Sequence, residues 1–246
     1  MLIVANWKAY VEDMEKAKKL VARAKRLAHG GQVEIVVAPP APFLSALAGG
    51  RSTVAFAAQD ISATTGGAHT GEATAPAFAS AGATYAIIGH SERRALGEGS
   101  TAIAEKLAHA LAHGLIPILC VGERVRDGEG AYLQVVREEI ASALGTLSPK
   151  ERSQVIVAYE PLWAIGKTAA EAMPPEELGE MVLYVRKVLA ELLPGGSARH
   201  SRILYGGSVE PANARALAGA SGIDGFLVGH ASVDMASFSA MVRDLR

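Results

Sequence analysis

Eight short apolar runs recur along the chain, and they restrict its fold more than any other feature of the sequence. Each run is rich in Val, Ile, Leu or Ala without alternation, a pattern typical of strands that are buried on both faces. Such strands belong to parallel sheets that are covered on both sides. The runs are residues 2–6, 34–38, 54–58, 85–88, 117–121, 155–159, 202–205 and 225–228.

Segments with helical periodicity lie between most of these runs. Apolar residues recur every three or four positions, at Met14, Ala17, Val21 and Ala24 and later at Leu178, Met181, Val182, Val185, Leu189 and Leu192. The shortest connections, after the second and the seventh run, give the weakest helix signals. The connection after the seventh run still offers a helix start, with Pro211 in the first turn.

Strand and helix that alternate eight times predict an α/β fold, and eight is the number of βα units that closes a barrel. We therefore expect a single-domain (β/α)8 TIM barrel over residues 1–246. The proline pairs of the chain are too short to act as domain linkers. An open, doubly wound sheet is the alternative, but it would place phosphate-type glycines after the first strand, whereas here they come late in the chain.

Charge and composition argue against several kinds of partner. The chain has 24 Lys and Arg against 25 Asp and Glu without a basic cluster, so no nucleic acid is expected. The sequence has no stretch of about 18 apolar residues, so no membrane span is expected. The single cysteine, Cys120, excludes an internal disulfide, and residues 1–8 lack the features of a signal peptide, so a cytoplasmic protein is expected.

Polar residues directly follow three of the predicted strands: Asn6 and Lys8, His90 and Glu92, and Glu160. Because the C-terminal ends of barrel strands meet at one face, we expect a lysine, a histidine and a glutamate to converge there. Each of these residues alone also fits a structural role, as a solvated lysine, a hydrogen-bonded histidine or a strand-ending glutamate.

Glycine-rich segments follow the last two predicted strands, at residues 206–208 and 229–232. In a barrel these two loops commonly bind a phosphate through backbone N–H groups, and glycine lets the backbone approach an anion. A tight turn is the alternative for residues 206–207. The apolar segment 163–166 fits either a loop that closes over a ligand or a loop packed on the barrel rim.

Together these residues suit proton abstraction beside a carbonyl of a small phosphorylated substrate, with a carboxylate as base and histidine and lysine as stabilisers of an enediolate. Cys120 and the histidines lack metal-ligand spacing, so neither a metal nor a cofactor is expected. Two other functions stay open. One is a different phosphosugar barrel, such as an epimerase or aldolase, which should need a metal or a Schiff-base lysine, and the other is a non-catalytic scaffold.

Short motifs spread from the first strand to the last carry a family resemblance. They are residues 6–8 (NWK), 58–60 (AQD), 70–72 (TGE), 89–94 (GHSERR), 120–123 (CVGE), 158–166 (AYEPLWAIG) and 205–209 (YGGSV). In this order they resemble the triosephosphate isomerase family. The resemblance implies interconversion of dihydroxyacetone phosphate and glyceraldehyde 3-phosphate in glycolysis and gluconeogenesis.

The resemblance also implies roles for the polar residues at the strand ends. Glu160 is implied as the base and His90 as a neutral electrophile. Lys8 would supply positive charge, with Asn6 beside it, and Glu92 would lie near Lys8 or the substrate.

Phosphate-binding and dimer contacts are implied in the same way. Gly166, Ser208, Gly229 and the amide of His230 would hold the phosphate, under a lid formed by residues 161–168. Gln59 and the loop from Gly66 to Glu72, with Thr70 at its tip, resemble the homodimer contact of the family.

The chain departs from the family pattern at two places near the expected phosphate. Lys167 and Thr168 follow Gly166 directly, without a second glycine, and the run 169–175 is atypical. His230 stands where a second glycine normally completes the phosphate contact. We expect an active enzyme with altered phosphate affinity or lid kinetics.

Overall fold

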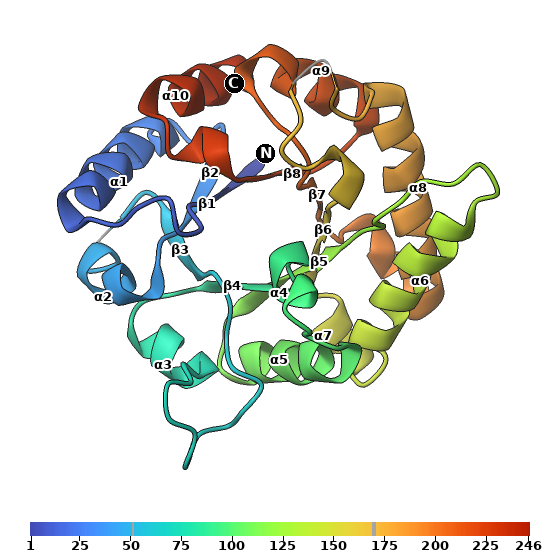
Figure 1. The fold of residues 1–246 in the computed structure, drawn as a ribbon, viewed down its shortest axis with the longest axis horizontal. Coiled ribbons are helices and arrows are strands. Elements are labelled where there is room, and N and C mark those ends of the chain that lie inside the picture. The colour runs from blue at the N-terminus through green and yellow to red at the C-terminus, as the bar shows by residue number, and fades with distance from the viewer. Residues whose placement is uncertain (51, 169–170) are drawn as a thin grey trace.

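In the computed structural model, which describes residues 1–50, 52–168 and 171–246, eight parallel strands form a closed barrel in chain order (Figure 1). This confirms the predicted fold class. The strands are β1 (Leu2–Asn6), β2 (Glu34–Ala38), β3 (Ala55–Ala58), β4 (Tyr85–Ile88), β5 (Ile116–Val121), β6 (Ile156–Tyr159), β7 (Ile203–Tyr205) and β8 (Gly225–Val228). The predicted strands differ from these by one residue, at the starts of β3, β5, β6 and β7.

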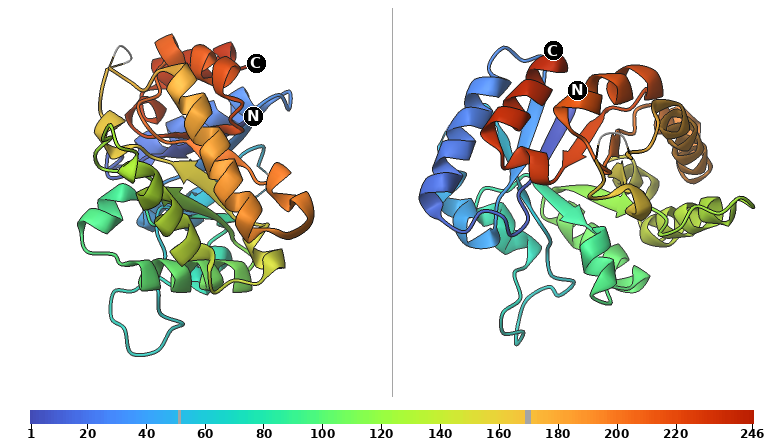
Figure 2. Two further views of the ribbon diagram at one scale, coloured as in Figure 1. Left: turned by 90° about the vertical axis from the view of Figure 1, so that its right-hand side faces the viewer. Right: turned by 45° about the horizontal axis from the view of Figure 1, so that its top comes forward.

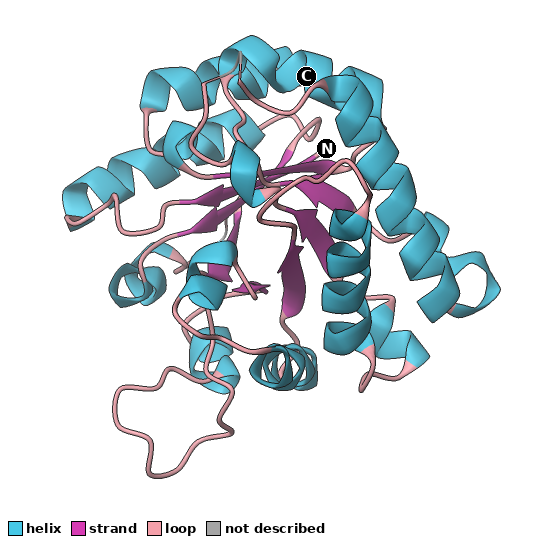
Figure 3. Ribbon diagram, turned by 45° about the vertical axis from the view of Figure 1, so that its right-hand side comes forward, coloured by secondary structure: helices cyan, strands magenta, loops and turns pink. Residues whose placement is uncertain are grey.

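Most helices surround the barrel on its outer side, whereas α4 (Ser91–Ala95) lies inside this ring in the view down the barrel (Figures 1 and 3). The other helices are α1 (Met14–Ala28), α2 (Leu44–Leu47), α3 (Ala75–Ser80), α5 (Ser100–Ala112), α6 (Ala131–Leu144), α7 (Pro149–Arg152), α8 (Pro175–Leu192), α9 (Pro211–Ser221) and α10 (Met235–Asp244). The connection from β2 to β3 holds only a 3-10 turn and the four-residue helix α2, as its weak periodicity indicates. The connection from β7 to β8 forms a full helix, α9, that begins at the predicted proline.

Two layers of apolar side chains form the core because successive strand residues point to opposite faces. In β1, Ile3 and Ala5 pack outward against the helices, while Leu2 and Val4 point into the barrel. The inner layer consists of Leu2, Val4, Val36, Ala38, Ala57, Tyr85, Ile87, Ile118, Cys120, Ile156, Ala158, Leu204 and Leu227. The barrel is therefore filled by side chains, which leaves its C-terminal mouth as the place for a site.

The loop between β3 and α3 extends away from the barrel in every view (Figures 1 and 2). Residues 65–73 are exposed, and the Ser62 amide donates to the Ala73 carbonyl at 2.8 Å, which closes the base of the loop. Among the described residues, no helix is both long enough and apolar enough to cross a membrane.

A polar cluster at the N-terminal end of the barrel joins the starts of β2 and β4 to Arg202, the residue before β7. The hydroxyl of Tyr85, at the start of β4, donates to Oε1 of Glu34 at 2.8 Å, and the guanidinium of Arg202 lies 2.8 Å from Oε2 of the same carboxylate. Burial and the hydrogen bond to Glu34 raise the pKa of Tyr85 to about 12.

This shift predicts a loss of stability in alkaline solution. The unfolded chain loses the Tyr85 proton near the ordinary pKa of 10.0, whereas the folded chain keeps it up to about 12. The contribution of this tyrosine to the free energy of unfolding is therefore complete below pH 10 and is lost as the pH rises through about 12. Tyr85→Phe has no such proton. Urea unfolding followed by circular dichroism should show the stability gap between wild type and variant shrinking over that range, and a constant gap would contradict the assignment.

Candidate active site

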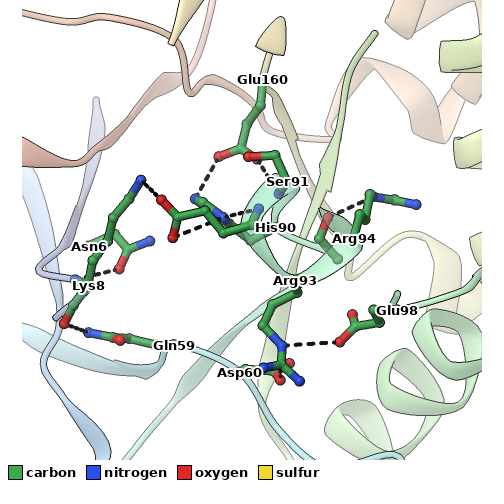
Figure 4. Close-up of polar contacts among 12 residues, drawn as sticks. Asn6, Lys8, Gln59, Asp60, His90, Ser91, Arg93, Arg94, Glu98 and Glu160 are labelled. Atoms are coloured by element: carbon green, nitrogen blue, oxygen red, sulfur yellow. Dashed lines mark hydrogen bonds and ion pairs between the residues drawn. The ribbon is translucent and has the colours of Figure 1, made fainter. Parts of the chain in front are cut away.

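A cavity of about 300 Å³ opens at the C-terminal end of the barrel. Eight of the predicted site residues line it, namely Asn6, Lys8, His90, Glu160, Gly166, Ser208, Gly229 and His230. Glu92 is the exception, since it contacts the site through Lys8. Figure 4 shows Lys8, His90 and Glu160 meeting there from the ends of β1, β4 and β6.

The turn after β1 holds Lys8 in the left-handed region, at a φ of 46°. Two side chains stabilise this strained backbone: Asn6 Oδ1 accepts from the Lys8 amide at 3.1 Å, and Gln59 Nε2 donates to the Lys8 carbonyl at 2.9 Å. The ammonium of Lys8 lies 2.6 Å from Oε1 of Glu92. Gln59, expected at a dimer contact, thus supports the lysine within its own chain.

The hydrogen bonds of His90 define its protonation state. His90 caps the N-terminus of α4, and its Nδ1 accepts a hydrogen bond from the Glu92 amide at 3.1 Å. A nitrogen that accepts carries no proton, so the ring is neutral and its proton is on Nε2. Nε2 lies 3.3 Å from Oε1 of Glu160. The histidine therefore presents a neutral N–H donor at the carboxylate and the cavity.

Glu160 is only 2% exposed. Its Oε2 accepts from the Ser91 amide at 3.3 Å, so both carboxylate oxygens lie against the start of α4. The thiol of Cys120 is close by, and burial together with the charge of Glu160 raises the pKa of that thiol. Cys120 is therefore a neutral neighbour of the carboxylate.

Packing explains the two glycines after β7. A Cβ at position 206 would lie 2.7 Å from Cγ of Glu160, and a Cβ at position 207 would lie 2.2 Å from the hydroxyl oxygen of Tyr205. Neither contact is possible without a shift, so Gly206 and Gly207 leave room for the side chains of Glu160 and Tyr205.

The predicted lid lies on Ser208. After the 3-10 turn η2 (Leu162–Ala164), the Ala164 carbonyl accepts from the Ser208 amide at 3.2 Å, and the Lys167 amide donates to Ser208 Oγ at 2.9 Å. Ser208 is therefore engaged by the loop in this structure. The atypical run 169–175 is described from residue 171 onward, and residues 169 and 170 lie outside the described part.

His230 lines the cavity in the 3-10 turn after β8, and its ring packs edge-on against Tyr10 with centroids 5.4 Å apart. The imidazole thus has an aromatic partner at the cavity mouth.

Sequence reasoning missed the role of Glu123, which is 1% exposed. Its Oε1 accepts from the Tyr159 hydroxyl and from Trp163 Nε1, each at 2.8 Å, so it connects the residue before Glu160 to the lid. Burial and the charge of Glu123 raise the pKa of Tyr159. Glu123 also follows a strand end, β5, and the rule that selected Glu160 could have found it.

The fold and this site define a (β/α)8-barrel protein with a neutral histidine, a lysine and a buried carboxylate at its mouth. The chain matches the family model for triosephosphate isomerase over residues 1–245. It is 39% identical to the triosephosphate isomerase of Symbiobacterium thermophilum over 244 residues, which cover 98% of this chain and 94% of the relative.

Two further relatives have the same name. The protein of Thermus thermophilus is 39% identical, and the match covers 99% of this chain and 98% of the relative. The protein of Alcanivorax borkumensis is 41% identical, and the match covers 98% of this chain and 96% of the relative. The chain belongs to the triosephosphate isomerase family, and it is an isomerase.

The tight packing at position 206 leads to a prediction for Gly206→Ala. The new Cβ should displace the Glu160 side chain and lower kcat at least about 100-fold, while overpacking costs about 1–3 kcal/mol of stability. The matched control is Gly219→Ala in α9, where a Cβ meets nothing within 4 Å and should stabilise the helix by about 0.5–1 kcal/mol. Steady-state kinetics and thermal unfolding measure both effects. Wild-type turnover in Gly206→Ala would contradict the packing argument.

Proposed function

We propose that this protein interconverts dihydroxyacetone phosphate and D-glyceraldehyde 3-phosphate through an enediolate, in glycolysis and gluconeogenesis in the cytoplasm. The observation that carries the proposal is the convergence of Lys8, His90 and Glu160 on one cavity of about 300 Å³. The names of the relatives support the substrate. The cavity size suits a three-carbon phosphate.

Glu160 is the proposed base. Its carboxylate removes a proton from C1 of dihydroxyacetone phosphate, and the C–H electron pair becomes the C=C bond of the enediolate. The proton of the C1 hydroxyl passes to the oxygen on C2, and the same carboxyl group returns its proton to the C2 carbon, so that C1 becomes the aldehyde with no net change in atoms. Glu160 reaches the carbon by turning away from the Ser91 amide, a long hydrogen bond of 3.3 Å that is easily given up.

His90 and Lys8 stabilise the charge that develops on the substrate oxygens. The neutral ring of His90 offers Nε2–H to these oxygens, and it is fixed in that tautomer by the Glu92 amide. The Lys8 ammonium adds a full positive charge, held in place by Glu92 and by the turn after β1. Both donors are positioned before the reaction begins, which avoids reorganisation during it.

The phosphate is proposed to bind in the same cavity, among Gly166, Ser208, Gly229 and the amide of His230. Ser208 must exchange its present contacts with the lid for contacts with the phosphate. A closed lid excludes water, which matters because an exposed enediolate phosphate eliminates its phosphate group.

Glu160→Gln tests the assignment of the base. The amide is isosteric but cannot accept the proton, so kcat should fall by about 10³-fold or more with little change in thermal stability. The rate is followed from glyceraldehyde 3-phosphate by coupling to glycerol-3-phosphate dehydrogenase and NADH. Glu105→Gln, on an exposed position of α5, serves as control.

An equally active Glu160→Gln variant would rule out this mechanism. Loss of wild-type activity with EDTA, or covalent trapping by borohydride, would indicate instead the metal-dependent or Schiff-base barrel enzymes considered above.

We also propose a homodimer formed through the loop from Gly66 to Glu72. The loop is exposed and extends beyond the barrel, and its base is closed by the contact between Ser62 and Ala73. Asp60, beside the base, is bound by Arg93 at 3.0 Å and by Lys106 at 2.7 Å. A rigid base and an exposed tip suit insertion into a second subunit.

Thr70→Asp should dissociate the dimer and reduce activity together, because a charge at the loop tip would be buried without a partner. Sedimentation velocity at several protein concentrations, with activity measured in parallel, provides the test. Thr146→Asp, at another exposed position, should change neither quantity. A fully active monomer would refute the proposed interface.

A further inference from the structure

Arg126 contacts both ends of the segment from η2 to the first turn of α8, which contains the predicted lid and is called the lid segment below. It lies in the connection between β5 and α6, and its guanidinium carbon is 5.8 Å from the ring centre of Trp163. Its Nη1 lies 2.7 Å from Oε2 of Glu177. Trp163 belongs to η2, which follows β6, and Glu177 is in the first turn of α8. One side chain therefore connects the start of the segment to the helix after it.

The surroundings of Arg126 make this connection firm. The Arg126 side chain is only 18% exposed, and its guanidinium also packs over the ring of Tyr132, at 4.7 Å from the ring centre. Cation–π contacts strengthen when the cation is partly removed from water. Trp163 is fixed from a second side, because its Nε1 donates to Glu123 at 2.8 Å.

This cluster is also connected to the catalytic carboxylate. Glu123, which binds Trp163, accepts a hydrogen bond from Tyr159, and Tyr159 directly precedes Glu160. Close to Trp163, Ala164 and Lys167 contact Ser208, which lines the cavity. Arg126 thus joins η2, which contacts the cavity wall through Ser208, to the first turn of α8.

We propose that Arg126 is a positioning residue that holds the two ends of the lid segment, η2 and the first turn of α8, at a fixed separation, so that the binding energy of the substrate is not used to fix them. The inference rests on the proposed function, in which this loop covers the phosphate. When the ends are released, part of the binding energy of the phosphate is used to order them, and the affinity falls. The chemical step, carried out by groups outside the loop, changes little.

Arg126→Met tests the proposal because it keeps the length of the side chain and removes the charge. We expect the KM for glyceraldehyde 3-phosphate to rise about five- to tenfold, with kcat within about threefold of wild type. Arg126→Lys should recover part of the loss, since it restores the ion pair but not the planar contact with the rings. Glu177→Gln removes the ion pair alone and should raise KM to a smaller extent.

Arg137→Met is the matched control. Arg137 and Glu191 form an ion pair between α6 and the last turn of α8, with Arg137 Nη2 3.0 Å from Glu191 Oε1, and Glu191 is as exposed as Glu177. This variant should keep the wild-type KM. Equal KM values in Arg126→Met and wild type would overturn the proposal, and so would equal KM increases in Arg126→Met and Arg137→Met, since the cause would then be general stability.

A fluorescence measurement separates this inference from the proposed reaction. The chain has two tryptophans, so Trp7→Phe leaves Trp163 as the only one. In that background, the emission of Trp163 is titrated with inorganic phosphate, and we expect half-saturation at a higher phosphate concentration when Arg126→Met is added. If the wild-type protein is inactive but Arg126→Met still raises the phosphate concentration at half-saturation, the proposed reaction is refuted and the positioning role is supported. If the wild-type protein is active but half-saturation is the same with and without Arg126→Met, the positioning role alone is refuted.

Discussion

The close approach of β5, β6 and β7 at the mouth of the barrel is the constraint on which the site depends. A Cβ at Gly122 would lie 2.0 Å from the Glu160 carbonyl oxygen, and a Cβ at Gly206 would lie 2.7 Å from its side chain. The Glu160 amide also donates to the Val121 carbonyl at 2.7 Å. Glycine directly after both neighbouring strands is therefore what allows a glutamate to be buried here, facing the start of α4.

The proposed anion site at the mouth of the barrel does not depend on an excess of positive charge, in a chain whose net charge is −1. Lys8 is paired with Glu92, and His90 is neutral, so the resting site holds little excess positive charge. Backbone N–H groups carry no net charge, yet they are directional donors to a phosphate. Recognition of this kind depends on loop geometry, which is why the lid and its supports matter as much as the charged residues.

The sequence allowed the barrel and the meeting of Lys8, His90 and Glu160 to be predicted, because parallel strands of similar length place their C-terminal ends together. It could not reveal the positive φ of Lys8 or the cluster around Arg126. Those features arise from contacts between residues about 50 positions apart, such as Gln59 with Lys8 and Arg126 with Glu177. Local patterns predict elements, whereas such contacts exist only once the elements are packed.

The glycines assigned to phosphate binding do not carry equal weight. Gly206 and Gly207 are required by packing against Glu160 and Tyr205, so their presence would be expected even without a phosphate. At Gly229, in contrast, a Cβ would make only an ordinary contact of 3.6 Å with the Lys8 side chain. Packing therefore does not require glycine at position 229, and its backbone, at a φ of −87° and a ψ of −110°, lies outside the regions that other residues commonly adopt. The side chains of Glu160 and Tyr205 thus account for Gly206 and Gly207, whereas the turn after β8, where Gly229 precedes His230 at the edge of the cavity, has room for the proposed phosphate contact.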